Sequence, residues 1–252
     1  MVNKSTSIKL RSSDCLSEQS RQISNQFRER TAQAEREFEQ NIARRLTFAD
    51  KQKIEKIIAF DLAHENNLWV DDIYTLGKIF QKGNENTVLL NEYERVVYKC
   101  NNLMNSFGKI STLFDIIESH NQLFYEVPYE IIGFTGIDNG AKLIPHIEVI
   151  LKQPFVYNAE HATPNEIANY MQSIAFRQIN IHTFENDNYI VYDLHPRNVL
   201  KNLEGNIFVI DNRIETKNNY KLKEKNVLLS NNIQNKLIDS DIEENNFIKR
   251  KF

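Results

Sequence analysis

Apolar residues in the first part of the chain recur at helical spacing. No Gly or Pro occurs in residues 17–46, and charged residues separate the apolar ones, which are Ile23, Phe27, Ala34, Phe38 and Ile42. Steps of three or four residues place such side chains on one face of a helix. The pattern predicts a long helix with a narrow apolar stripe, suited to docking on its own domain or to pairing with a second copy.

A second helix is predicted to follow directly. Thr47 and Asp50 stand three residues apart, in an arrangement that resembles a capping box. The apolar residues that come after them share one helical face and are Ile54, Ile57, Ile58 and Leu62. The two helices form a predicted helical arm over residues 15–66. Residues 1–14 mix charged and polar residues without a period, which predicts a disordered lead-in.

Short β-type runs dominate the chain after residue 66. Residues 87–90 and 95–98 predict the strands of a hairpin, and residues 109–120 return to helical spacing. Residues 128–134 and 141–151 predict two further strands, joined by a Gly- and Asn-containing turn at residues 136–140. Residues 67–153 are therefore predicted to form a small β-rich region that contains one helix.

Helix and strand patterns alternate again in residues 154–252. Thr163 followed by Pro164 predicts the N-terminus of a helix. Residues 189–192 and 207–210 predict two short strands, and residues 226–237 predict a last helix. The whole pattern predicts an α+β fold.

Composition narrows the function classes. The net charge of -3 and the pI near 6.1 give no global basic field, so nucleic acid is not an expected partner, and residues 217–225 are interpreted as a solvated basic segment. Two cysteines suit a reducing compartment better than a disulfide framework. No apolar run approaches ~20 residues, so no membrane span is expected, and a cytoplasmic location is predicted.

Three oxygen-bearing side chains follow the predicted strands near the C-terminus. Asp193 ends one strand, Asn198 comes five residues later, and Asp211 comes thirteen residues after that. A tight hairpin around Gly205 would bring Asn198 and Asp211 together. Phosphoryl transfer from ATP needs oxygen ligands for Mg²⁺ and a carboxylate beside the attacking hydroxyl. The spacing therefore favours a phosphotransferase site.

The same segment resembles the protein-kinase superfamily. Asp-Leu-His-Pro-Arg-Asn-Val-Leu from Asp193, followed by Gly-Asn-Ile-Phe-Val-Ile-Asp ending at Asp211, is similar in sequence and spacing to the kinase catalytic loop and metal-binding strand. His195, in the place that usually holds Lys, is similar to the aminoglycoside and choline kinase branch. Over residues 69–213 the order of motifs resembles the serine/threonine/tyrosine kinase domain found in polyvalent proteins of phages and conjugative elements, which are mobile genetic elements.

The resemblance implies a fold and cofactors. We expect a bilobal kinase-like fold, with an N-lobe of residues 67–153, a reduced C-lobe and tail of residues 154–252, and ATP and Mg²⁺ as cofactors. Asp193 would position the acceptor, and Asn198 and Asp211 would hold the metal. Lys99 would hold the α and β phosphates, and Glu118, on the predicted helix, would pair with Lys99. The alternatives are an ordinary exposed strand lysine and a solvated helical glutamate.

Two further assignments rest on the resemblance and have plainer alternatives. Gly83 and Asn84 would form the turn that covers the phosphates, although an ordinary hairpin turn explains them equally well and the full glycine signature is absent. Residues 149–153, with Lys152 among them, would be the hinge whose backbone meets adenine, or simply the end of a strand.

Three departures from the kinase pattern keep a second hypothesis open. Tyr192 stands where protein kinases commonly have Arg, Asn212 and Arg213 replace Phe-Gly after Asp211, and few residues remain for a C-lobe. The phosphoacceptor could be a protein hydroxyl or a small molecule. The alternative is a pseudokinase or a scaffolding module that acts through its helical arm, by self-association or with a partner protein.

Overall fold

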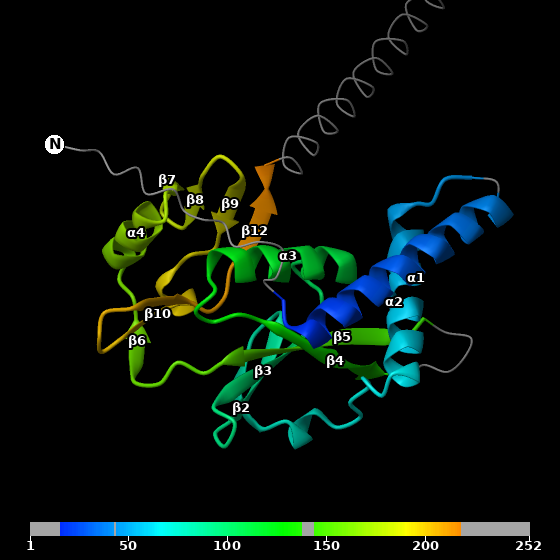
Figure 1. The fold of residues 1–252 in the computed structure, drawn as a ribbon, viewed down its shortest axis with the longest axis horizontal. Helices are drawn as coiled ribbons and strands as arrows, with labels where there is room; N and C mark the ends of the chain where they lie inside the picture. The colour runs from blue at the N-terminus through cyan, green and yellow to red at the C-terminus, as the bar shows by residue number, and fades with distance from the viewer. Residues whose placement is uncertain (1–15, 43, 138–143, 218–252) are drawn as a thin grey trace, which may run out of the picture.

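The computed structural model describes residues 16–42, 44–137 and 144–217, and shows an α+β fold (Figure 1). The predicted lead-in, the helix at residues 226–237 and part of the turn at residues 136–140 lie outside the described residues. The two N-terminal helices lie at one side of the largest sheet, and two smaller sheets lie at its other end.

The largest sheet has five antiparallel strands in the order β1-β2-β3-β5-β4. Its strands are β1 (Lys78–Lys82), β2 (Asn86–Asn91), β3 (Val96–Asn101), β4 (Glu130–Ile137) and β5 (His146–Pro154), and α3 (Ile110–Leu123) packs against it. Ile110, Leu113, Phe114 and Ile117 of α3 are buried, which confirms the predicted apolar face. Because β3 pairs with β2 on one side and β5 on the other, Lys99 stands in a fully paired strand.

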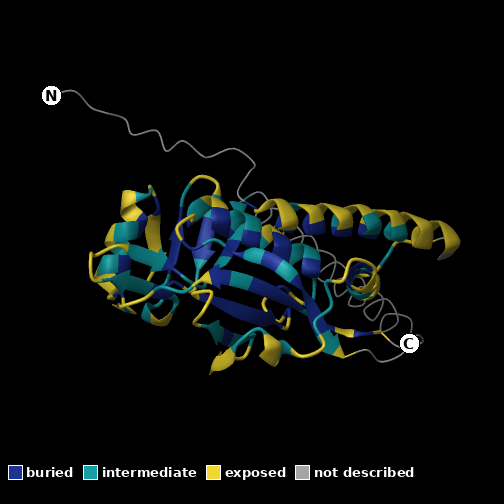
Figure 2. Ribbon diagram, turned by 60° about the horizontal axis from the view of Figure 1, so that its bottom comes forward, coloured by how far each residue is buried: buried dark blue, intermediate teal, exposed yellow. Residues whose placement is uncertain are grey.

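The N-terminal helices are part of this packing. They are α1 (Glu18–Ile42) and α2 (Phe48–Glu65), and Thr47 and Asp50 form the predicted capping box of α2. Phe27 of α1 is fully buried and meets Phe114 of α3 edge to face, with ring centroids 5.4 Å apart. The outer side of α1 is exposed (Figure 2). The first part of the apolar stripe of α1, with Ile23 and Phe27, therefore docks on the chain's own sheet and helix, whereas Phe38 is 40% exposed.

After β5, the rest of the described chain packs around short strands. The strands are β6 (Ala159–His161), β7 (Arg177–Asn180), β8 (Thr183–Glu185), β9 (Tyr189–Tyr192), β10 (Val199–Asn202), β11 (Ile207–Val209) and β12 (Arg213–Thr216). They make a sheet of order β11-β10-β6 and another of order β12-β9-β8-β7. In residues 154–217, α4 (Pro164–Ser173) is the one α-helix, and it begins at the predicted Thr163 cap. Short 3-10 turns occur at Ile73–Thr75 and Pro196–Asn198.

None of the helices in the described residues combines the length and apolar character that crossing a bilayer demands.

Candidate active site

The loop after β9 holds Asp193 in a constrained position. Its φ of 64° lies in the left-handed region, which non-glycine residues rarely adopt and which recurs at functional sites. Asn198 Nδ2 donates to the Asp193 carbonyl at 2.9 Å and to its Oδ2 at 3.1 Å. His195 Nε2 lies 3.3 Å from the other carboxylate oxygen, Oδ1. The Asp193 side chain is thus held on both sides by residues of its own loop.

The β10–β11 hairpin brings Asp211 back to the same loop. Val199 pairs with Val209, and Gly205 takes a φ of 85° in the tight turn between the strands. The Asn198 carbonyl accepts hydrogen bonds from the backbone N–H of Ile210 at 3.0 Å and of Asp211 at 3.4 Å. The interval of thirteen residues between Asn198 and Asp211 is therefore the length of one short hairpin.

Lys99 reaches the same place from the larger sheet. Its Nζ donates to the Ile210 carbonyl at 2.6 Å and to Tyr129 Oη at 2.9 Å. Burial lowers the pKa of Lys99, while the carboxylates of Asp211 and Glu85 act in the opposite direction. Lys99 thus contacts the residue before Asp211, and the Asn198 carbonyl and side chain link Asp211 to Asp193.

Tyr129 is a residue of this site that the sequence did not reveal. Its Oη contacts the Ile210 carbonyl at 2.8 Å, and Lys99 Nζ lies 4.9 Å from the ring centroid. Burial raises the pKa of Tyr129 well above its usual value, so the hydroxyl stays neutral. In the sequence Tyr129 is one aromatic residue near the start of the strand predicted at residues 128–134, which is also the pattern of an ordinary core residue.

The structure corrects the pairing expected for Glu118. Glu118 Oε1 lies 3.0 Å from Arg28 Nη2, and Ser24, also on α1, donates to the same oxygen at 3.3 Å. Lys99 Nζ instead donates hydrogen bonds to Tyr129 Oη and to the Ile210 carbonyl. The reason is that α1 packs alongside α3 and supplies a guanidinium to the face on which Glu118 lies.

Gly83 and Asn84 lie in the β1–β2 turn, followed by Glu85. Gly83 N–H donates to the Asn86 carbonyl at 2.9 Å, as in an ordinary hairpin, and Asn102 Nδ2 donates to the Asn84 carbonyl at 2.7 Å. The turn is thus tied to the linker that precedes α3. Glu85, which the sequence did not single out, accepts a hydrogen bond from Asn101 Nδ2 at 3.1 Å, and its charge opposes the effect of burial on the pKa of Lys99.

The hinge expected at residues 149–153 is corrected for residues 149–152, whereas Gln153 pairs with Val97 of β3 alone. Val149, Ile150 and Leu151 are paired on both sides, with β3 and with β4, and Lys152 stands opposite Tyr98 and Glu130. A doubly paired strand has no spare backbone groups for a ligand. Lys152 Nζ lies 3.5 Å from Glu130 Oε2, so its charge is engaged within the sheet. The chain leaves the sheet only at residues 155–158.

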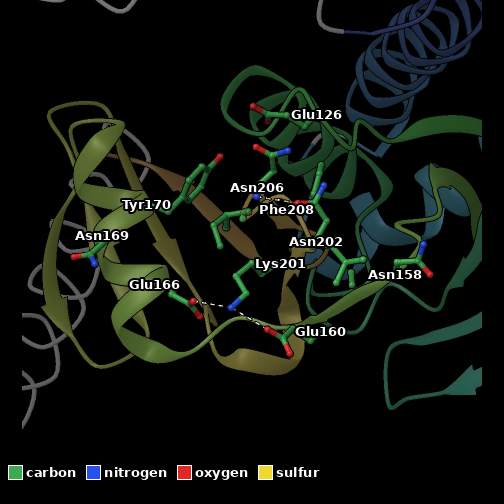
Figure 3. Close-up of a pocket in the computed structure, with 14 residues that line it drawn as sticks. Glu126, Asn158, Glu160, Glu166, Asn169, Tyr170, Lys201, Asn202, Asn206 and Phe208 are labelled. Carbon is green, nitrogen blue, oxygen red and sulfur yellow. Dashed lines mark hydrogen bonds and ion pairs between the residues drawn. The ribbon is translucent and has the colours of Figure 1, made fainter.

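A separate cavity of about 1230 Å³ lies beside α4 and the β6–β10–β11 sheet (Figure 3). Lys201 projects into it between Glu160 and Glu166, at 2.9 and 2.8 Å from their carboxylate oxygens. None of the four site residues Lys99, Asp193, Asn198 and Asp211 lines this cavity. It is therefore distinct from the place where those residues meet.

Comparison with models of known families identifies the family of the chain. The family model described as serine/threonine/tyrosine kinase found in polyvalent proteins matches residues 50–218, which is most of the chain. The chain belongs to this family. The match to this polyvalent-protein kinase family begins within α2 and ends just after β12, so it includes Lys99 and the whole Asp193–Asp211 loop. No curated protein and no solved structure matches the chain.

Membership of the kinase family makes a nucleotide and a metal the groups to test against the site. Asn198 donates to Asp193 through Nδ2, so its side-chain oxygen Oδ1 could ligate a cation, while its main-chain carbonyl accepts from the Asp211 N–H at 3.4 Å. An amide oxygen and a carboxylate are ligand types that Mg²⁺ prefers. Within residues 16–42, 44–137 and 144–217, no group of three or more His, Cys, Asp or Glu side chains could by itself hold a metal ion. The donor set therefore fits a hard cation bound jointly with phosphates.

Proposed function

We propose that the protein is an ATP- and Mg²⁺-dependent phosphotransferase. The supporting observation is the contact of Lys99 Nζ with the Ile210 carbonyl at 2.6 Å, directly before Asp211. This contact joins the Lys99 ammonium of the large sheet to the loop that carries Asn198 and Asp211. Phosphoryl transfer depends on positioning and charge stabilisation, for which a fixed cation, metal ligands and a carboxylate are the required parts.

Each of these residues has one role in the proposal. Lys99 binds the α and β phosphates, and Asn198 and Asp211 hold Mg²⁺, which neutralises charge on the transferred group. Asp193 orients the acceptor hydroxyl and takes up its proton. Asn198 and His195 fix both oxygens of Asp193, so that its carboxylate is oriented before the acceptor arrives. For the base of the nucleotide, we propose residues 155–158 as the hinge.

The acceptor that we propose is a Ser, Thr or Tyr hydroxyl of a protein, in keeping with the description of the family. A small-molecule hydroxyl is the alternative that His195 suggests, because small-molecule kinases carry His at that position. We also propose a cytoplasmic, mobile-element context and an N-lobe of residues 67–153 followed by a reduced C-lobe. Partners that act through the helical arm stay a prediction.

Transfer of labelled phosphate tests the proposal. Full-length protein with γ-labelled ATP, Mg²⁺ and a mixture of protein and small-molecule acceptors is expected to transfer label. Asp211→Asn and Asp193→Asn are each expected to reduce transfer by about a hundredfold or more, because metal binding and acceptor positioning are lost. Glu204→Gln, a similar change at the exposed β10–β11 turn, is the control. Transfer that persists undiminished in Asp211→Asn contradicts the proposal.

A pseudokinase is the second candidate, and Asn212 is the observation that favours it. Asn212 Nδ2 lies 3.0 Å from His120 Nδ1, which anchors the residue after Asp211 to α3 where kinases have a mobile Phe-Gly. A pseudokinase would gain thermal stability with Mg-ATP, since a ligand stabilises the folded state that binds it, but would transfer no phosphate.

A further inference from the structure

Glu85 is fixed in the β1–β2 turn by asparagine side chains. Asn101 Nδ2 donates to Glu85 Oε1 at 3.1 Å, and Asn105 Nδ2 donates to Oε2. Asn102 contributes its backbone N–H, which donates to the Glu85 carbonyl at 3.0 Å. Main chain and carboxylate of Glu85 are therefore both attached to the linker between β3 and α3. A carboxylate held by two donors keeps one orientation.

The carboxylate of Glu85 acts on the groups of the proposed phosphate site. Glu85 and Asp211 oppose the effect of burial on the pKa of Lys99. Asp211 in turn contributes, after burial, to a raised pKa of Glu85. Lys99 and Asn101 stand two residues apart on β3, so their side chains lie on the same face of the sheet. Because Asn101 Nδ2 contacts Glu85 Oε1 at 3.1 Å, the Glu85 carboxylate lies on the face from which Lys99 projects.

Lys99 needs a negative partner that α3 does not supply. A buried ammonium without a counter-charge is costly, and Lys99 is only 6% exposed. The α3 carboxylates Asp115 and Glu118 both contact Arg28, at 2.9 and 3.0 Å. The neutral hydroxyl of Tyr129 provides a hydrogen bond but no charge. Among the described residues, Asp211 and Glu85 are the carboxylates that oppose the effect of burial on the pKa of Lys99, and Asp211 is the proposed metal ligand.

We propose that Glu85 is the positioning carboxylate of Lys99, the role that sequence reasoning gave to Glu118. This inference rests on the proposed phosphotransferase function. Glu85 keeps the Lys99 ammonium charged and aimed at the phosphates, and the asparagine clamp keeps Glu85 in place. The β1–β2 turn thereby orients the cation that binds the phosphates, independently of α3.

Kinetics of Glu85→Gln test this role, because the substitution removes the charge and keeps the shape. We expect kcat to fall about tenfold or more, which corresponds to a loss of about 1.4 kcal/mol or more of charge stabilisation at Lys99. The KM for ATP is expected to change less than about threefold. The reason is that Glu85 also repels the phosphates, so losing it weakens alignment and relieves repulsion in the ground state at once.

Three further variants show whether the effect of Glu85→Gln comes from the charge and position of the Glu85 carboxylate. Glu85→Asp, which keeps the charge, is expected to recover part of kcat. Asn105→Ala leaves Glu85 charged but removes one clamp donor at an exposed position, and is expected to lower kcat by a smaller factor than Glu85→Gln. If Glu85→Gln does not fold, the kinetics of Asn105→Ala test the inference in its place. Glu92→Gln, in the exposed β2–β3 turn, is the matched control and keeps wild-type kinetics.

Glu118→Gln separates the two competing carboxylates. This change breaks the contact with Arg28, so we expect a lower melting temperature and a kcat within about twofold of wild type. A large loss of kcat in Glu118→Gln, together with unchanged kcat in Glu85→Gln or in Asn105→Ala, overturns the inference. Absence of any phosphate transfer by the wild-type protein is a different outcome, because it removes the proposed function itself.

Discussion

At the scale of single residues, the site depends on contacts between segments that are far apart in the sequence. Tyr129 lies thirty residues from Lys99, and Ile210 lies 111 residues from it. The Asp193–Asp211 loop could be predicted because its geometry is local: one turn and one short hairpin fix it. Tyr129 and Glu85 could not be predicted as site residues, because a single Tyr or Glu has no sequence spacing that relates it to Lys99.

Removing the hydroxyl of Tyr129 is expected to disturb both stability and activity. Tyr129→Phe keeps the ring beside Lys99 but takes away one hydrogen-bond partner of a buried ammonium. We expect a loss of about 1–3 kcal/mol in the free energy of unfolding, measured by urea titration, and lower phosphate transfer. The same change at exposed Tyr93 is the control. Equal stability of Tyr129→Phe and wild type would show that the hydroxyl contributes nothing.

His120 makes stability depend on pH in a defined window. Burial lowers its pKa to about 3, and its ring contacts the Val127 carbonyl at 3.2 Å and Asn212 Nδ2 at 3.0 Å. In the unfolded chain the His120 ring binds a proton below a pH of about 6.5, whereas in the folded chain it does so only near pH 3. This contribution to stability is therefore complete above pH 6.5 and is lost progressively as the pH falls toward 3.

The pH effect is measurable with one substitution. His120→Gln can keep one donor and one acceptor but cannot titrate. We expect the free energy of unfolding to fall less steeply between pH 6.5 and 4.5 in His120→Gln than in wild type. His161→Gln, on the exposed side of β6, is the matched control. Identical slopes in wild type and His120→Gln would contradict a neutral, buried His120.

At the scale of elements, strong local signals were the ones that the sequence predicted. The caps at Thr47 and Thr163 and the apolar face of α3 each depend on residues within one or two turns. The strands β6, β7 and β8 were missed because they are three or four residues long and β6 and β7 are polar. Such strands form only because neighbouring strands offer backbone partners, which no local pattern records.

The α4 cap gives a second test of pH dependence, at the level of one helix. Hydrogen bonds from Lys201 and Thr163 lower the pKa of Glu166 to about 2. A depressed pKa stabilises the fold above the unfolded value near 4.5, and that contribution is lost as the pH falls toward 2. Glu166→Gln is expected to melt at a lower temperature than wild type at pH 7 and to approach it near pH 2.5. A constant difference across this range would contradict the assigned role of the carboxylate.

At the scale of the whole molecule, the N-terminal helices complete the region that carries Lys99. Ser20 Oγ of α1 accepts a hydrogen bond from the Ile131 N–H of β4 at 2.7 Å, and Leu62 of α2 is fully buried in the same core. Sequence reasoning left open whether α1 docks on its own domain or pairs with a copy. The periodicity alone cannot decide this, since both arrangements bury the same stripe.

Truncating Phe27 tests this docking. Phe27 is fully buried against Phe114, so Phe27→Ala is expected to cost about 3–5 kcal/mol in the free energy of unfolding. Phe38 lies on the same helix and is 40% exposed, so Phe38→Ala is expected to cost much less. Equal losses in the two variants, measured by chemical denaturation, would contradict the docking of α1 on α3.

The central claim is that Lys99, Asn198 and Asp211 form one metal–nucleotide site. The most direct measurement is calorimetric titration of the wild-type protein with a non-hydrolysable ATP analogue, with Mg²⁺ and with EDTA. We predict binding that weakens about tenfold or more without Mg²⁺, and that becomes insensitive to Mg²⁺ in Asp211→Asn. Binding of equal strength with and without Mg²⁺, or an unchanged Mg²⁺ requirement in Asp211→Asn, would contradict the account.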